Sequence, residues 1–232
     1  MKTAVLAAAA GLAGASWAVR GRSSTVFGPS IWRGLNQRKS VAITFDDGPT
    51  RATRVILQTL SSFNVTATFF ECGMNVERHP EIAREVACAG HEIGNHSHSH
   101  PNCALRSFGF IRDEFRRAQE TIQAATGVTP RVLRAPYGVR WFGFRRMQQE
   151  LGLQGVMWSI IGRDWRLPAA AIAARIISRV KPGDIICLHD GRGTLENPDI
   201  SQTVEAVRRI VPALMETGYH FETVTDLLCP TK

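Results

Sequence analysis

The chain lacks the features that mark several common protein classes. Its 232 residues contain five cysteines but no C-x-x-C pair, which argues against a zinc ribbon or a thioredoxin-like redox site. No repeat, low-complexity tract or linker divides it, so we expect a single domain with a sizeable core. The net charge is +8, yet no dense basic tract, helix-turn-helix cue or RNA-recognition signature is present. We therefore expect no nucleic-acid partner. The charge indicates a solvated surface or, alternatively, association with an anionic cell wall or membrane surface.

Histidine is scarce, but three of the seven histidines fall within five positions. His96 and His100 are four residues apart, which places both rings on one face if the segment is a helical turn. If the segment is extended, His98 shares that face and competes as a ligand. Imidazole is the commonest side-chain metal ligand, so the segment is a candidate metal site. A polar, histidine-rich surface loop is the alternative.

Two adjacent carboxylates, Asp46 and Asp47, follow an apolar run. Residues 40–45 are apolar and β-branched, which predicts a buried strand, and Gly48-Pro49-Thr50 is a turn signal. The pair is therefore predicted at the carboxyl end of a strand, where catalytic groups of α/β proteins gather. An ordinary Asp-Gly turn is the alternative, but two carboxylates this close are costly unless a cation or an arginine compensates them.

Three further strand-like runs end in charged or aromatic residues. Arg134 follows residues 132–133, Asp164 and Trp165 follow residues 156–161, and His189 follows residues 184–188. Arg134 is placed to pair with one of the aspartates. Together with the aspartate pair and the histidine segment, these make five such segments in one chain, which are hard to explain as ordinary polar turns.

Taken in order, these segments resemble the five motifs of the polysaccharide deacetylases, carbohydrate esterase family 4, which share the NodB-homology domain. The matching segments are Thr44-Phe45-Asp46-Asp47-Gly48-Pro49, His96-Ser97-His98-Ser99-His100, Arg134-Ala135-Pro136-Tyr137-Gly138, Asp164-Trp165 and His189. The resemblance covers residues 40 to 228, approximately. It implies metal-dependent hydrolysis of the N-acetyl amide of a sugar in a polysaccharide or cell-envelope glycan, which releases acetate and a free amine.

The resemblance also implies a role for each residue. Asp47, His96 and His100 would hold a divalent metal, zinc in the first place and cobalt or a similar ion as the alternative. Asp46 would be the general base, fixed by Arg134. His189 would be the general acid, oriented by Asp164. The backbone N–H of Tyr137 would face the developing oxyanion, and Trp165 would form an apolar wall beside the acetyl group.

One position departs from the family pattern, whose last motif reads Leu-x-His. Position 187 is Cys in this chain, and Leu188 adjoins the histidine instead. If the run is a strand, Leu188 faces the other way. We name Leu188 as a candidate substrate contact together with Trp165 and Tyr137, and the role of Cys187 stays open.

Strand-like and helix-like segments alternate along most of the chain. Helices are expected at residues 51–62, 80–89, 105–125, 141–151, 168–180 and 201–217, and strands at 40–45, 65–70, 91–94, 153–157, 184–188 and 220–221. This alternation predicts a parallel sheet with helical crossovers. The family resemblance narrows the prediction to a single α/β domain, a distorted (β/α) barrel of about seven parallel strands. A doubly wound open sheet is the alternative.

Residues 3–19 are uncharged and mostly apolar. They resemble a signal peptide, with Ser16-Trp17-Ala18 as a small-x-Ala cleavage site, or an N-terminal membrane segment. We expect residues 1–19 to have that role, 20–39 to be a connecting segment and 40–232 to be the catalytic domain. The run is short for a transmembrane helix, and the positive charge directly behind it disfavours translocation of the rest of the chain. We expect an exported or membrane-tethered protein of the cell envelope, with a cytoplasmic location as the alternative.

Two classes of function are compatible with these residues. The first is a metal-dependent deacetylase, acting on peptidoglycan, a chitin-like oligosaccharide, another envelope glycan or a lipid-linked sugar. The second is a non-catalytic carbohydrate-binding protein on the same scaffold. The complete set of candidate catalytic residues favours the enzyme, and metal-dependent acetate release separates the two.

Overall fold

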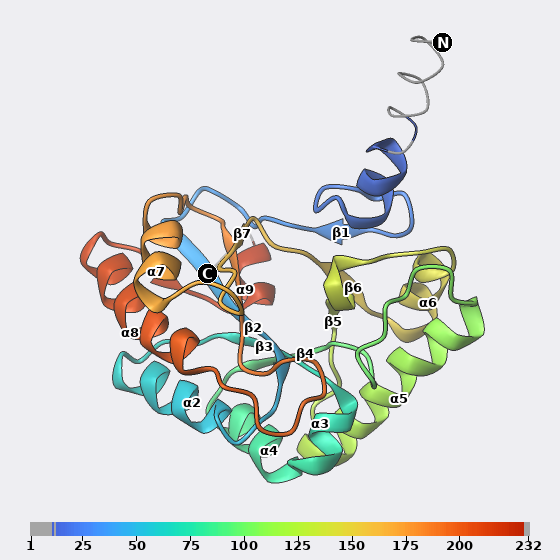
Figure 1. The fold of residues 1–232 in the computed structure, drawn as a ribbon, viewed down its shortest axis with the longest axis horizontal. Coiled ribbons are helices and arrows are strands. Elements are labelled where there is room, and N and C mark those ends of the chain that lie inside the picture. The colour runs from blue at the N-terminus through green and yellow to red at the C-terminus, as the bar shows by residue number, and fades with distance from the viewer. Residues whose placement is uncertain (1–10, 12, 230–232) are drawn as a thin grey trace.

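The computed structural model describes residue 11 and residues 13–229, in which short strands alternate with helices (Figure 1). The strands are β1 (Ser30–Ile31), β2 (Ser40–Gly48), β3 (Thr68–Glu71), β4 (Glu92–Asn95), β5 (Val132–Leu133), β6 (Gln154–Val156), β7 (Ile160–Ile161), β8 (Ile185–His189) and β9 (His220–Phe221). The helices are α2 (Thr53–Ser62), α3 (Gly73–Arg78), α4 (Pro80–Cys88), α5 (Phe108–Thr126), α6 (Phe144–Leu151), α7 (Ala169–Ile177), α8 (Ser201–Glu216) and α9 (Val224–Leu228). Residues 13–20 are also helical.

The strands pair in parallel in the order β1-β6-β5-β4-β3-β2-β8-β7, and β9 pairs with the start of β2. Strands β2 to β6 are neighbours in chain order, whereas a doubly wound sheet would reverse direction at a switch point. The sheet curls with its helices outside (Figure 1), which confirms the distorted (β/α) barrel. The expected strands correspond to β2, β3, β4, β5, β6, β8 and β9, whereas β1 and a separate β7 were not predicted. Within the described residues, β1 and β7 form the two free edges of the sheet.

The apolar run at residues 156–161 is not one strand. Val156 ends β6, which pairs with β1 and β5, whereas Ile160 begins β7, which pairs with β8. Residues 157–159 carry the chain from β6, which lies next to the β1 edge, to β7 at the other edge of the sheet. The amide of Met157 donates to Ile31, and the amide of Ser159 donates to Ile185. This crossing brings the two free edges close together.

The expected connecting segment at residues 20–39 also contributes a strand to the sheet, which was not predicted. Strand β1 joins the sheet within this range, and Arg33 pairs with the buried Asp184 at 2.6 Å. Arg140, which is buried, donates from its guanidinium to the backbone oxygen of Ser24 at 2.6 Å. These contacts make the segment part of the folded domain. The short helices α3 and α9 were not predicted either, because five or six residues carry little periodicity.

Strand β2 is buried on both faces, which explains its almost continuous apolar sequence. Val41, Ile43 and Phe45 pack with the core that lies under the outer helices, whereas Ala42 packs with a second cluster that contains Phe70 and Ile185. The same alternation brings Asp46 to the inner face. Asp46 and Asp47 therefore end a strand whose position the core defines on both sides.

Among the described residues, no helix is long and apolar enough to cross a membrane. The predicted signal peptide or membrane segment lies mostly outside the described residues, because residues 1–10 and 12 are not among them. Its role stays a prediction.

Candidate active site

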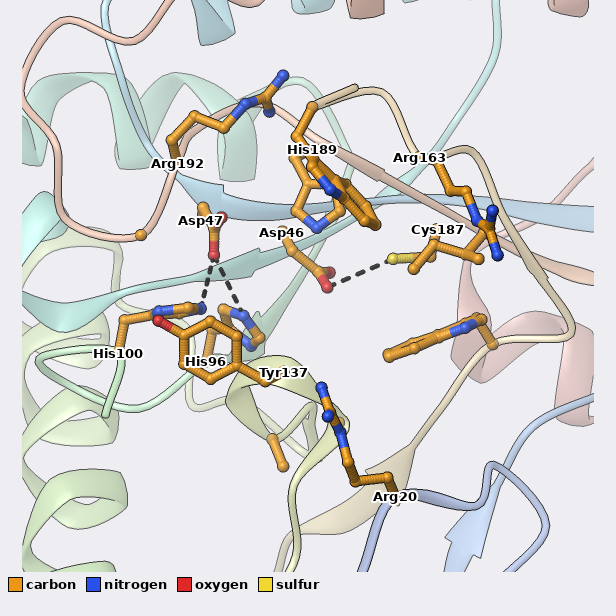
Figure 2. Close-up of a pocket in the computed structure, with 16 residues that line it drawn as sticks. Arg20, Asp46, Asp47, His96, His100, Tyr137, Arg163, Cys187, His189 and Arg192 are labelled. Atoms are coloured by element: carbon orange, nitrogen blue, oxygen red, sulfur yellow. Dashed lines mark hydrogen bonds and ion pairs between the residues drawn. The ribbon is translucent and has the colours of Figure 1, made fainter. Parts of the chain in front are cut away.

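A cavity of about 620 Å³ opens at the carboxyl ends of β2, β4 and β8 (Figure 2). Seven of the predicted site residues line it: Asp46, Asp47, His96, His100, Tyr137, Trp165 and His189. Arg134 and Asp164 lie behind this layer, in contact with Asp46 and His189 respectively. The structure thus brings together side chains that are up to 143 positions apart in sequence, from Asp46 to His189.

A backbone irregularity lets both aspartates face the cavity. Adjacent residues of a regular strand point to opposite faces. Here the register between β2 and β3 shifts between Asp46 and Gly48, and Asp47 has a φ of 75°. A left-handed conformation is uncommon for a residue with a side chain and often marks a functional site. It turns the Asp47 carboxylate toward His96 and His100 (Figure 2).

His96 and His100 converge from a loop after β4, rather than from a helical turn or an extended strand. Ser97 and His100 have positive φ values of 66° and 55°, which bend the loop. The Nε2 atoms of His96 and His100 lie 3.3 and 3.0 Å from Oδ1 of Asp47. His98 faces away, and its Nε2 lies 3.9 Å from Glu77. The loop therefore selects two of the three histidines.

The three converging atoms fit a divalent metal. Nδ1 of His96 lies 2.8 Å from the backbone oxygen of Arg134, which only accepts hydrogen bonds, so Nδ1 carries the proton and Nε2 keeps its lone pair. Oδ1 of Asp47 is buried and makes no well-formed hydrogen bond in the described part of the chain. Two ligands about 2.1 Å from one ion lie roughly 3.0–3.4 Å apart at angles of about 90–110°, close to the observed spacing.

The charges agree with this assignment. Burial alone would raise the pKa of the Asp47 carboxyl, but the neighbouring imidazoles of His100 and His96 hold the pKa well below its usual range. Asp47 is therefore a carboxylate, the form that binds metal. A second group of candidate ligands, Asp46, Cys187 and His189, lies in the same cavity. Its members are partly engaged by Arg134 and Asp164, so the first group fits a metal better.

Arg134 holds Asp46 in place. Its fully buried guanidinium donates to Oδ1 of Asp46 at 2.6 Å and to the Thr44 hydroxyl at 2.7 Å, and it lies 4.1 Å from the centre of the Phe70 ring. A buried charge is tolerated when it is paired and hydrogen-bonded, as here. Oδ2 of Asp46 is turned to the cavity side, where the Cys187 thiol donates to it at 3.5 Å.

Asp164 orients His189. Its Oδ1 lies 2.9 Å from Nδ1 of His189, and its Oδ2 accepts from the Thr203 hydroxyl at 2.7 Å. Nδ1 is thus the engaged nitrogen, and Nε2 is left to face the cavity (Figure 2). Burial would lower the pKa of His189, but the hydrogen bond and the negative charge of Asp164 raise the pKa to about 9. His189 is therefore protonated at neutral pH, as a proton donor must be.

Replacing Asp164 with asparagine is expected to move the alkaline limb of the kcat profile to lower pH. If His189 is the proton donor that the resemblance implies, its protonated form is the active one, and its pKa of about 9 keeps it protonated until the pH rises through that value. Without the carboxylate, the hydrogen bond and the charge of Asp164 no longer raise the pKa, and only the charges of Asp47 and Asp46 oppose the lowering by burial. The measurement is kcat against pH for both proteins. If the alkaline limb lies at the same pH in both proteins, Asp164 does not set the protonation of His189.

Leu188 is not a substrate contact, which corrects the prediction. Its side chain is fully buried in the core under the outer helices, where Gly162 and Ile172 are its neighbours. Side chains alternate along β8, so Cys187 and His189 face the cavity while Leu188 faces the helices. Burial, followed by the nearby Asp46 charge, raises the pKa of the Cys187 thiol well above its usual value. It is an uncharged wall residue beside Asp46.

Replacing Cys187 with leucine is expected to raise the ratio of kcat/KM for acetyl over propionyl substrates. The larger side chain fills space beside Asp46, and one methylene in an apolar pocket is worth about 1–3 kcal/mol. Cys187→Ser keeps the size and should leave the ratio unchanged. An unaltered ratio in a folded Cys187→Leu protein would remove Cys187 from the acyl pocket.

Several residues that line the cavity were not predicted, namely Arg20, Trp158, Arg163 and Arg192. Arg192 donates to the backbone oxygen of Asp164 at 3.2 Å, and Figure 2 shows Arg20 entering from another part of the chain. Arg192 follows the His189 motif closely enough to have been suspected. Nothing in the sequence connects Arg20 with the site, because it directly follows the apolar N-terminal run.

The cavity brings together three candidate metal ligands, a carboxylate held by Arg134 and an imidazole held by Asp164. Comparison with known proteins agrees: residues 33–156 match the family model described as "Polysaccharide deacetylase". The chain belongs to the polysaccharide deacetylase family.

Two curated relatives match most of the chain. A chitooligosaccharide deacetylase of Bradyrhizobium sp. is 34% identical over 198 residues, which cover 82% of this chain and 90% of the relative. A peptidoglycan-N-acetylglucosamine deacetylase of Bacillus cereus is 35% identical over 201 residues, covering 85% and 92%. The likeness extends over most of this chain and almost the whole of each relative.

A solved structure of the same family bears on whether this fold implies catalysis. A wild-type family 4 carbohydrate esterase described as a pseudoenzyme, from Bacillus anthracis, superposes with a TM-score of 0.79 at 28% identity, over 88% of this chain and 70% of that one. The fold alone therefore does not decide between catalysis and its absence. The residues in the cavity have to decide it.

Proposed function

We propose that this chain is a metal-dependent deacetylase that hydrolyses the N-acetyl amide of a sugar in a glycan. The observation that supports the proposal most directly is that a three-residue ligand set, a base and an acid line one cavity. A non-catalytic carbohydrate-binding protein would not need Arg134 and Asp164 to hold the base and the acid in place. Asp47, His96 and His100 would hold the ion, with zinc as the first candidate because the donors are imidazole and carboxylate.

Hydrolysis of an amide needs an activated water, a stabilised oxyanion and a protonated leaving amine. A bound divalent ion polarises the carbonyl and lowers the pKa of water from about 15.7 toward about 7. Asp46, held by Arg134, takes the proton from the attacking water. The backbone N–H of Tyr137 stabilises the oxyanion, and the αL conformation of Tyr137, with a φ of 57°, sets the direction of this group.

His189 completes the reaction. Its Nε2 donates a proton to the nitrogen of the breaking C–N bond, so that acetate and a free amine leave. Trp165 contacts the His189 ring edge-on at a centroid distance of 5.1 Å and is half exposed. It forms the apolar wall beside the acetyl methyl. Two titrating groups with different partners thus divide the roles of base and acid.

Acetate release tests this proposal. The purified protein is incubated with peptidoglycan fragments, chitooligosaccharides and other N-acetylated glycans, with and without a chelator, and acetate is measured. We expect release that stops on chelation and returns with zinc or cobalt. Binding of a glycan without acetate release, at full metal occupancy, would support the non-catalytic alternative instead.

An N-acetylated glycan as partner also suggests a location. We propose that the protein acts in the cell envelope, exported or tethered by its N-terminal segment, where a net charge of +8 favours association with anionic surfaces. Cell fractionation of the full-length chain tests this, and recovery from the cytoplasmic fraction alone would contradict it.

A further inference from the structure

A second cleft, of about 400 Å³, lies between the two free edges of the sheet. Trp32 and Arg33, which follow β1, form one side, and β7 forms the other. Trp158 and Ile161 line both this cleft and the catalytic cavity, so the two are neighbours. The place where the barrel stays open therefore carries a second hollow beside the catalytic one.

The second cleft is strongly basic. Its charged lining residues are Arg22, Arg33, Arg175, Arg179, Lys181 and Asp184. Asp184, the one acid among them, forms an ion pair with Arg33, whose guanidinium donates to it at 2.6 and 2.9 Å. Among the described residues, the remaining four cations face the cleft without an acidic partner. Like charges this close are costly unless an anion compensates them.

The cations also extend toward the catalytic cavity. Partial burial, and then the charges of Arg179 and Arg163, lower the pKa of Arg175, so these three arginines lie within electrostatic range of one another. Arg163 lines the catalytic cavity (Figure 2). In the described part of the chain, the side chains of Arg20, Arg163, Arg179 and Lys181 make no hydrogen bond or ion pair. Cations without a partner thus line both the second cleft and the catalytic cavity.

Other side chains in the cleft are held in place. The Arg22 guanidinium donates to the backbone oxygen of Ser159, and it lies 5.1 Å from the centre of the Trp32 ring. Arg175 donates to the backbone oxygen of Ile161 at 2.9 Å. Trp32 and Trp158 are half-buried and provide apolar walls. The cleft is thus a partly ordered hollow rather than a uniformly solvated basic surface.

We infer that this cleft binds a phosphate or diphosphate group carried by the substrate, so that the substrate is an N-acetylated sugar linked through phosphate. This inference rests on the proposed function and specifies its substrate class. Arginine guanidinium groups match phosphate oxygens in pairs, and lysine adds a point charge. A single carboxylate carries one negative charge, which is fewer than the four positive charges without an acidic partner. This difference favours a phosphate-bearing group over a singly charged sugar acid.

The test compares two N-acetylated sugars that differ in charge. We would measure kcat/KM for neutral N,N′-diacetylchitobiose and for UDP-N-acetylglucosamine, using the full-length, metal-loaded protein. The variant is Arg179→Glu with Lys181→Glu, both exposed at the cleft. The matched control is Arg84→Glu with Arg131→Glu, both exposed and lining neither cleft. A third substrate, polyprenyl diphosphate-linked N-acetylglucosamine in detergent micelles, distinguishes a lipid source of the phosphate from a nucleotide source.

We expect the parent protein to prefer at least one diphosphate substrate. The ratio of kcat/KM for that substrate over chitobiose should fall about 10- to 100-fold in the cleft variant, because charge-assisted hydrogen bonds are replaced by repulsion. The control should keep the parental ratio, and added salt should lower that ratio in the parent. No preference for either diphosphate substrate, or an equal ratio in the variant and the control, would overturn the inference.

Calorimetric titration separates this inference from the proposed function. If no substrate releases acetate, the proposed function fails, but binding of UDP-N-acetylglucosamine is still measured. Binding that weakens about 10-fold or more in the cleft variant, and not in the control, would then support the phosphate site alone. Equal binding by all three proteins, or no binding, would overturn the phosphate site.

Discussion

Replacing His100 with alanine is expected to remove tightly bound divalent metal and nearly all acetate release. His100 contributes one of three atoms that converge on one point, and its Nε2 lies 3.0 Å from Asp47. The two remaining ligands cannot complete a site of three protein ligands, which is the usual number in catalytic zinc centres. Metal content per chain, measured by mass spectrometry after dialysis, is the primary readout. It does not depend on knowing the substrate.

His98→Ala is the matched control for that experiment. It removes an imidazole two residues away whose ring faces Glu77 and not the cavity. We expect it to keep its metal and its activity. Equal metal content in His100→Ala and the parent would contradict the assignment of His100 as a ligand. Loss of metal from His98→Ala alone would place the metal site on the other side of the loop.

Removing the base or the acid should be nearly as severe, for a different reason. Asp46→Asn keeps the shape of the side chain but cannot accept a proton, and His189→Ala removes the proton donor. A positioned proton-transfer group is usually worth about 10²–10⁴-fold in rate, so we expect kcat to fall within that range for each variant. Metal content should be retained in both, because neither residue belongs to the ligand set of Asp47, His96 and His100.

The folding of these variants has to be checked alongside their rates. Asp46→Asn leaves the buried Arg134 without its counter-charge, and breaking a buried pair costs about 3–5 kcal/mol. Thermal unfolding therefore accompanies each kcat measurement, and the exposed His220→Ala serves as the control for histidine removal. A folded variant with near-parental kcat would show that its assigned role is wrong.

The residue types of the site were predictable from the sequence, and so was their placement at the ends of strands. Asp46, Asp47 and His189 follow apolar runs, and a buried parallel strand is the simplest structure for such runs. Parallel strands end at one edge of the sheet, so the side chains at their carboxyl ends meet there. The alternation of strands and helices likewise predicted a parallel sheet. These features are local, and local patterns are the kind of information that a sequence displays directly.

Side-chain direction depended on details that the pattern of residues does not contain. The bulge at Asp47 turns two neighbouring carboxylates to one cavity, and bends at Ser97 and His100 select the histidines that converge. Both depend on backbone conformations that cost energy locally and persist because the surrounding contacts favour them. Whether Cys187 or Leu188 faces the cavity depends on the register of β8 in the sheet. A shift of one residue would exchange the side chains on the two faces of the strand.

The sequence by itself determined the chemistry that this protein has available, namely its carboxylates, imidazoles and arginines, and the strands that carry them. The tertiary structure alone decided which way these side chains point and which cations gather in the second cleft. The second cleft shows this most clearly, because Arg22 and Arg179 are far apart in the chain and meet where β1 and β7 leave the barrel open. Closure of the sheet is a property of all its strands at once, since curvature and register accumulate from strand to strand.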